Sequence, residues 1–256
     1  MNYTDAKKEF EHYLDGYDRN NDKVRLKIIH TYGVVHDMED ICRRMNLSLE
    51  DTELAKIIAL LHDIGRFEQL KRFDSFEPAT MDHAAYGVQV LFEEGMIRRF
   101  VPENQWDDII RTAIALHSNF KLENISNPRT LLHARLIRDA DKLDNCRVKL
   151  EDDLPVFMGM SGEDIGAQTI TPKVYDTVLS NQCIYSPDRV TKNGLLGFLR
   201  STFLRYLFPR KALTSLKNTT TSIKLSTGFH TAILIQKIKW KHPHTSYRIY
   251  PSCPWV

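Results

Sequence analysis

Apolar residues recur every three or four positions along most of the chain up to about residue 182, and this spacing predicts α-helices. It places the apolar side chains on one face of each helix, where they can form a core. Strand-like alternation is scarce, and clusters of Gly, Pro, Asn and Ser predict the loops between the periodic segments. We therefore expect an all-α domain with helices over residues 5–17, 22–45, 53–64, 82–100, 104–120, 130–150 and 172–182. Ser48, followed by Asp51, has the pattern of a helix N-cap before the third of these.

The segment ALLHDIGRFEQL, residues 59–70, ends an apolar run with the adjacent residues His62 and Asp63. Neighbouring residues on a helix point about 100° apart, so both can reach one cation if the backbone turns there, and we predict that turn at Gly65. A carboxylate at the end of an apolar helix is costly to bury without a partner, and a metal ion would be the strongest partner. The alternative is that Asp63 pairs with Arg66 or with a helix terminus.

Other predicted helices carry ligand-type side chains in apolar surroundings. His30 lies within LKIIHTYGVV, and His83 and His117 lie in DHAAYGVQVL and IALHSNF. A single histidine in such a place is more often structural than functional, so the interpretation depends on several of them meeting. The segment RDADKLDN contains three aspartates, of which we expect one to face inward: Asp139, Asp141 and Asp144.

Together these motifs resemble the HD-domain superfamily of metal-dependent phosphohydrolases. In that superfamily a histidine on one helix, an adjacent His-Asp pair on a later helix and a downstream aspartate bind the metal. HTYGVV, LLHDIGR and RDADKLD are similar to these motifs and follow the same order, over residues 20–150. The resemblance implies an HD-domain helical bundle with a metal site at its centre, held by His30, His62, Asp63 and Asp141.

The resemblance also implies roles for residues around that set. His83 and His117 are similar to histidines that bind a second metal or the substrate phosphate in some members. We expect Arg66, Arg138 and Lys142 to contact the substrate phosphate, because guanidinium and ammonium groups bind phosphate oxygens well. The alternative for these three is a solvated surface position.

A second His-Asp pair, His36 and Asp37, competes for the role of first ligand. His36 lies six residues after His30, which is about 240° further around a helix, so the two cannot easily face one site. The sequence context favours His30.

Two imidazoles and two carboxylates form a mixed nitrogen and oxygen ligand set. Such a set suits Mn²⁺, Fe²⁺, Co²⁺, Ni²⁺ or Mg²⁺, and zinc is also compatible with it. We expect one or two ions per chain. The predicted activity is hydrolysis of a phosphomonoester or phosphodiester by a metal-activated water. The alternative is a non-catalytic HD-fold module that senses a nucleotide or a metal.

Two subclasses of the superfamily fit poorly. Guanosine tetraphosphate hydrolases place a Glu-Asp pair shortly after the His-Asp pair, where this chain has Arg66 and Phe67. Cyclic-di-GMP phosphodiesterases carry a Gly-Tyr-Pro triplet, which this sequence lacks. The chain resembles the stand-alone bacterial HD hydrolases, which implies a nucleotide or another small phosphorylated substrate.

Composition adds the cellular setting. Hydrophobic residues make up 42% of the chain and charged residues 27%, as in ordinary globular proteins. The four cysteines are widely spaced and form no CxxC pair, so we expect reduced thiols. There is no signal-peptide pattern at the start and no apolar run long enough to span a bilayer. We therefore predict a cytoplasmic protein.

The charge is distributed unevenly along the chain. Residues 189–256 contain 12 of the 35 basic residues and none of the 33 acidic ones, so we predict a hydrolase domain over 1–188 followed by a basic segment. This segment could form a basic amphipathic helix that touches membranes or phosphate-rich polymers, or pack on the domain and attract anionic substrates. We favour a third interpretation, an out-of-frame terminus that is partly disordered. No motif specific to nucleic-acid binding occurs there.

Overall fold

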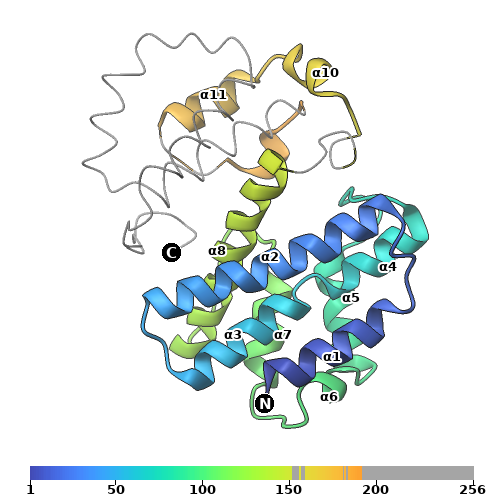
Figure 1. The fold of residues 1–256 in the computed structure, drawn as a ribbon. Helices are drawn as coiled ribbons and strands as arrows, with labels where there is room; N and C mark the ends of the chain where they lie inside the picture. Colours follow the sequence, from blue (N-terminus) through green and yellow to red (C-terminus); the bar gives the residue numbers. More distant parts are fainter. Residues whose placement is uncertain (152–155, 157–158, 181, 183, 192–256) are drawn as a thin grey trace. The chain divides into compact units, whose positions relative to one another are not determined.

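The computed structural model describes residues 1–151, 156, 159–180, 182 and 184–191. All regular elements among these residues are helices, which confirms the prediction of an all-α protein (Figure 1). In chain order the elements are α1 (Tyr3–Leu14), α2 (Asp22–Arg44), α3 (Leu49–Leu61), α4 (Ile64–Phe73), α5 (His83–Val88), the π-helical turn η1 (Gln89–Glu93), α6 (Ile97–Phe100), α7 (Asp107–Leu116), α8 (Pro128–Glu151), α10 (Gly162–Gly166), α11 (Pro172–Leu179) and the 3-10 turn η2 (Ser186–Asp188).

The chain divides into two compact units. The first unit, Met1–Val148, contains every residue that the sequence analysis assigns to the site. The second unit begins at Lys149, and its described part has a small apolar cluster of Val174 and Ile184 with Ile170 packed against it. Residues 192–256 lie outside the described residues, so the predicted basic segment and its boundary stay predictions.

Within the part of the chain that the structure describes, no helix combines the length and the apolar character needed to cross a membrane.

Helix α3 lies at the core of the first unit. All residues from Ile57 to Leu61 are fully buried, and α3 packs against α1, α2 and α7. This second half of α3 is apolar on every side, and such a segment is stable only when other elements surround it. The predicted cap is confirmed, because the Ser48 side chain accepts a hydrogen bond from the Asp51 amide. The apolar run therefore leads into the interior, where it ends at His62.

The predicted helix 53–64 is interrupted near its end. Helix α3 stops at Leu61, and α4 begins at Ile64, after only two intervening residues. Between them Asp63 has φ −111° and ψ 21°, which lies outside the α region. Two adjacent side chains at such a break are no longer held about 100° apart by a continuous helix.

The predicted helix 82–100 is also divided. It consists of α5, the π-helical turn η1 and the short helix α6. Gly95, with a positive φ of 77°, separates η1 from α6, and glycine adopts this conformation without steric cost.

The break before α4 does not lie at Gly65, so this detail of the prediction is wrong. Gly65 is in the first turn of α4 and is needed for a different reason. A Cβ atom there would lie 2.3 Å from the carbonyl oxygen of His83 and 2.7 Å from the amide nitrogen of Gly87. Glycine at this position lets α4 and α5 approach each other closely.

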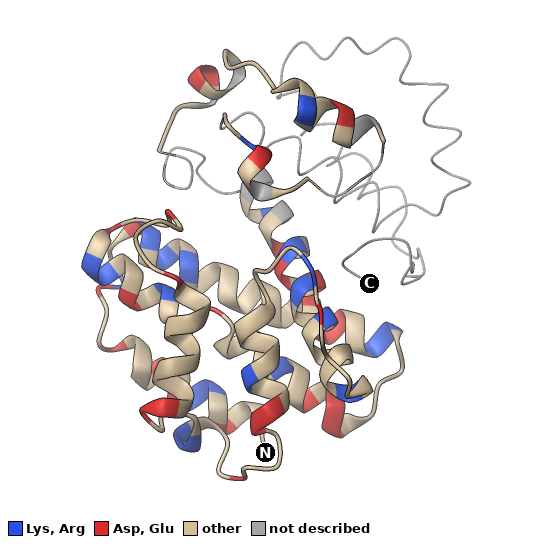
Figure 2. Cartoon of the chain, turned by 180° about the vertical axis from the view of Figure 1, so that it is seen from behind, with Lys and Arg blue, Asp and Glu red and all other residues tan. Residues whose placement is uncertain are grey.

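Charged residues of both signs are interspersed over the helices of the first unit (Figure 2). Some form exposed pairs, such as Lys23 with Asp74 and Arg72 with Glu68. Pairs of this kind contribute about 0–1 kcal/mol each, so the fold depends mainly on its apolar core. Charges that are buried in this core therefore need a separate explanation.

We expect Gly65→Ala to lower the free energy of unfolding by about 1–3 kcal/mol, because the new methyl group overlaps backbone atoms of α5. Gly16→Ala is the matched control, since a Cβ there would meet only the carbonyl oxygen of Tyr13, at 3.5 Å. Urea unfolding of both variants measures the difference. Equal stability of the two variants would show that α4 and α5 are not held at this distance.

Candidate metal centre

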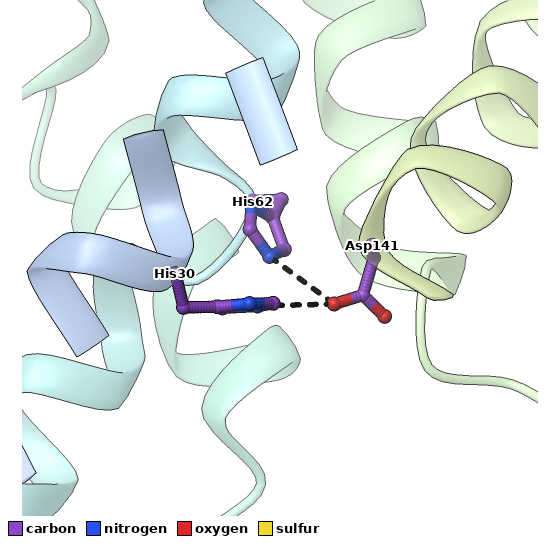
Figure 3. A group of neighbouring side chains, drawn as sticks. All are labelled: His30, His62 and Asp141. Carbon is purple, nitrogen blue, oxygen red and sulfur yellow. Dashed lines mark ion pairs between the residues drawn. The ribbon is translucent and has the colours of Figure 1, made fainter. Parts of the chain in front are cut away.

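Three helices bring predicted ligands to one buried place. His30 lies in the middle of α2, His62 follows the last residue of α3, and Asp141 lies in α8. The Nε2 atom of His30 is 3.1 Å from Oδ1 of Asp141, and Nε2 of His62 is 3.8 Å from the same oxygen (Figure 3). One ligand atom from each of the three lies within 4.8 Å of the others, which is close enough to surround a metal ion.

Asp63 links this group to a second one. Its Oδ2 atom is 3.2 Å from Nε2 of His62 and 3.8 Å from Nε2 of His30. Its Oδ1 atom is 3.2 Å from Nε2 of His83 and 3.5 Å from Nε2 of His117. The two carboxylate oxygens thus face different histidine pairs, and His62, Asp63 and His117 form the second group that could hold a metal.

Two of the histidines are oriented by the helices that they terminate. His62 follows α3 and His117 follows α7, each as the C-cap residue. The last carbonyl groups of a helix have no partner within the helix. One of them accepts a hydrogen bond from the Nδ1–H of each histidine: that of Ala59 for His62 and that of Ile114 for His117, both at 2.7 Å. Nε2 is then left with its lone pair, as a metal ligand requires.

His30 is oriented by a carboxylate instead. Its Nδ1 atom is 2.6 Å from Oδ2 of Asp144, one turn after Asp141 on the same face of α8. The approach depends on Gly33, because a Cβ atom there would lie 1.9 Å from Oδ1 of Asp144. Two of the three aspartates of RDADKLDN, Asp141 and Asp144, therefore lie against His30. From the sequence we expected only one of the three to face inward.

The ammonium of Lys27 keeps Asp63 ionised although it is buried. Burial alone would raise the pKa of its carboxyl group, but the positive charge of Lys27 holds the pKa well below the ordinary value. The Nζ atom of Lys27 contacts Oδ2 directly. The ionised carboxylate is the form that binds a cation.

The pKa of His30 is set by opposing effects. Burial and the ammonium of Lys27 lower it, but the carboxylates of Asp141 and Asp144 outweigh both and raise it. Burial would raise the pKa of Asp141, and its contact with His30 lowers it instead. Both aspartates in contact with His30 therefore remain charged at neutral pH.

Two buried atoms support the fit of a divalent metal. Among the described residues, neither Nε2 of His62 nor Oδ1 of Asp63 has a hydrogen-bond partner. Buried polar atoms rarely remain without one. Both are ligand atoms directed into the cluster, and imidazole nitrogen with carboxylate oxygen suits divalent transition metals. The residues present thus fit a divalent metal.

The predicted phosphate contacts have different surroundings. Arg66 lies beside the second group, with Nη2 3.0 Å from Nε2 of His83 and Nη1 3.2 Å from the carbonyl oxygen of Phe76. Arg138 is fully buried, and its Nη2 donates to the carbonyl oxygens of Asn119 and, at 3.2 Å, of Phe120. The surface alternative is therefore wrong for Arg138, whose contacts hold the chain segment that follows His117.

Lys142 is half-buried next to Asp141, and its Nζ donates to the carbonyl oxygen of Arg138 at 3.3 Å. A role for it at a substrate phosphate stays a prediction.

Sequence reasoning missed Lys27. It lies three residues before His30 on α2, so the two share a helix face. This three-residue spacing is the feature of the sequence that could have pointed to Lys27. A lysine in an amphipathic helix is usually solvated, however, and only the structure shows that this one is buried.

The other histidines of the first unit lie apart from the cluster. His36 is exposed, which supports the choice of His30 over the second His-Asp pair. His133 is fully buried in α8, and its Nε2 atom is 3.1 Å from Oδ1 of Asp51, which also accepts from Arg129. This histidine joins α8 to the start of α3.

Comparison with known families agrees with this geometry. Residues 28–146 match the family model described as HD domain, a range that contains His30, the His62–Asp63 pair and Asp141. This match supports membership of the HD-domain superfamily, whose members are generally metal-dependent hydrolases. No match to the chain was found among curated proteins or among solved structures.

We expect Asp144→Asn to weaken Mn²⁺ binding about 10–100-fold, because an amide no longer fixes the His30 ring through a charged acceptor. Asp139→Asn, on the same helix, is the matched control and should bind the metal as the wild type does. Titration with Mn²⁺ followed by calorimetry measures both. Equal affinities in the two variants would contradict the orienting role of Asp144.

We expect a separate pH effect from His133. Burial lowers the pKa of His133 below 6.5, and the nearby Asp51 only partly opposes this. The unfolded chain therefore binds the proton more readily, so the stability that this group contributes is complete above pH 6.5 and decreases as the pH falls below it. Between pH 7 and pH 5 the wild type should lose more unfolding free energy than His133→Gln. Parallel stability curves would contradict this.

Proposed function

We propose that this protein is a metal-dependent phosphohydrolase that cleaves a phosphate ester of a nucleotide or of another small phosphorylated metabolite. One observation carries the proposal. Ligand atoms of His30, His62 and Asp141, from α2, the end of α3 and α8, lie within 4.8 Å of one another beside the ionised carboxylate of Asp63. Membership of a superfamily of metal-dependent hydrolases adds independent support.

We assign a first divalent ion to His30, His62, Asp63 and Asp141. The mixed ligand set favours Mn²⁺, Fe²⁺, Co²⁺, Ni²⁺ or Mg²⁺, and zinc is also compatible. When bound, such an ion would lower the pKa of a water molecule and offset negative charge on the phosphoryl oxygens. The protein orients the two rings: the carbonyl group of Ala59, at a helix end, holds His62, and the carboxylate of Asp144 holds His30.

We assign substrate binding to the side of the site formed by the second group, His62, Asp63 and His117, together with His83. His83 and His117 face the other oxygen of Asp63, where they would hold either a second ion or the substrate phosphate. Burial lowers the pKa of His83 to about 4, with Arg66 and His117 acting in the same direction and Asp63 opposing, so its imidazole is neutral at physiological pH. A neutral ring can coordinate a metal or donate a hydrogen bond to phosphate.

Arg66 is the best candidate for a phosphate contact among the predicted cations. Its guanidinium lies against His83 and carries a planar set of N–H donors that suits phosphate oxygens. For Arg138 and Lys142 the support is weaker, because each donates to a backbone carbonyl group.

The proposal is tested by metal analysis of the purified full-length protein and a phosphate-release screen over nucleotides and small phosphate esters. Asp141→Asn should reduce bound metal and lower turnover at least about 100-fold, since it removes a ligand charge shared by His30 and His62. His36→Ala, which alters the exposed His-Asp pair, is the control and should keep both properties.

The outcomes separate the two candidate functions. A wild-type protein that binds the metal but releases phosphate from none of the substrates would favour the non-catalytic sensing module. Unchanged metal content and turnover in Asp141→Asn would contradict the ligand assignment itself.

A further inference from the structure

Lys27 is a buried cation at the edge of the first ligand group, which consists of His30, His62 and Asp141. Only 11% of its side chain is exposed, although lysine side chains usually extend their ammonium group into water. It lies one helical turn before His30, on the same face of α2. Its position is therefore set by the same helix that carries a proposed metal ligand.

The ammonium group of Lys27 has one described ion-pair partner, Oδ2 of Asp63. An ammonium group carries three N–H donors, and a buried charge is costly unless hydrogen bonds surround it. The same Oδ2 atom is 3.2 Å from Nε2 of His62 and 3.8 Å from Nε2 of His30. The remaining donors of Lys27 are thus close to whatever the first ligand group binds.

Lys27 and Arg66 lie on different sides of Asp63. Lys27 contacts Oδ2, on the side of His62. Arg66 contacts Nε2 of His83, which faces Oδ1. A tetrahedral phosphate group has enough oxygens to bind cationic groups on two sides at once.

The balance of charge also calls for an anion. The two carboxylates of Asp63 and Asp141 are matched in number by two cationic groups, those of Lys27 and Arg66. The carboxylate of Asp144 has its own partner, because its Oδ1 atom is 2.6 Å from Nε of Arg147. A divalent ion added to this set leaves an excess of positive charge in a buried site. An anion that contacts both the ion and a buried ammonium group would offset it.

We propose that Lys27 binds a non-bridging phosphate oxygen of the substrate, on the opposite side of Asp63 from Arg66. This inference rests on the proposed phosphohydrolase function and adds a substrate-positioning residue to it. Lys27 pairs with Oδ2 of Asp63 through one donor and directs the others to the phosphate.

The test uses full-length Lys27→Met, which keeps the length of the side chain and removes its charge. Two affinities are measured by calorimetry: that for Mn²⁺ alone, and that of the Mn²⁺-loaded protein for inorganic phosphate. We expect Mn²⁺ to bind at least as tightly as in the wild type, because a competing cation next to Asp63 is gone. Phosphate binding should weaken about 10–100-fold, the usual effect of losing a hydrogen bond to a charged group.

Lys23→Met is the matched control. Lys23 lies one turn earlier on α2 and pairs with Asp74 at the surface, at 2.7 Å, so the variant removes the same charge away from the cluster. It should change phosphate affinity by less than about twofold. Lys27→Arg, which restores a cation with different geometry, should recover part of the lost affinity. If Lys27→Met does not fold, as judged by circular dichroism, Lys27→Gln decides by the same two affinities.

Unchanged phosphate affinity in Lys27→Met would overturn the proposal and leave Lys27 as a counter-ion of Asp63. A parallel loss of Mn²⁺ and phosphate affinity would also overturn it, because Lys27 would then act only through the metal ligand. A wild-type protein that binds neither Mn²⁺ nor phosphate would instead refute the phosphohydrolase function, so the two failures are distinguishable.

Discussion

The burial of one carboxylate, that of Asp63, is the constraint around which the first unit is arranged. Taking a carboxylate out of water costs several kcal/mol unless charges and hydrogen-bond donors surround it. Here α2 contributes the ammonium of Lys27 to one oxygen. The nitrogens of His83 and His117, from α5 and the end of α7, lie near the other oxygen, which has no hydrogen-bond partner among the described residues. The packing of α2 against the bundle therefore supplies the charge that offsets the buried carboxylate.

Much of this arrangement could be predicted from the sequence. The helical periodicity of apolar residues predicts the main helices, because burying one face of each is the principal source of their stability. The surroundings of His30 distinguish it from His36, since a histidine among apolar neighbours on a core-facing stripe is directed inward. The adjacent pair at the end of an apolar run likewise indicates a polar centre inside the bundle.

The remaining features of the site depend on distances between helices, and the periodicity of apolar residues gives no information about these distances. Gly33 and Gly65 matter because Asp144 and the backbone of α5 lie where a Cβ atom would be, and a sequence shows neither neighbour. Lys27 carries a charge that a sequence pattern assigns to the surface, and for Arg138 the sequence left a substrate phosphate or the surface as the alternatives. Their burial follows from carbonyl groups and a carboxylate supplied by segments far away in the chain.

The position of the histidines at helix ends explains how an apolar bundle can contain a polar centre without weakening its helices. A helix interior satisfies its own backbone groups and offers nothing to orient an imidazole, whereas the last turn has free carbonyl groups. His62 and His117 use these carbonyls through Nδ1, so the hydrogen bond that completes the helix also fixes the ring. His30 lies mid-helix, where no such carbonyl is free, and it requires the carboxylate of Asp144 in its place. The different partners of the three rings thus follow from where each lies along its helix.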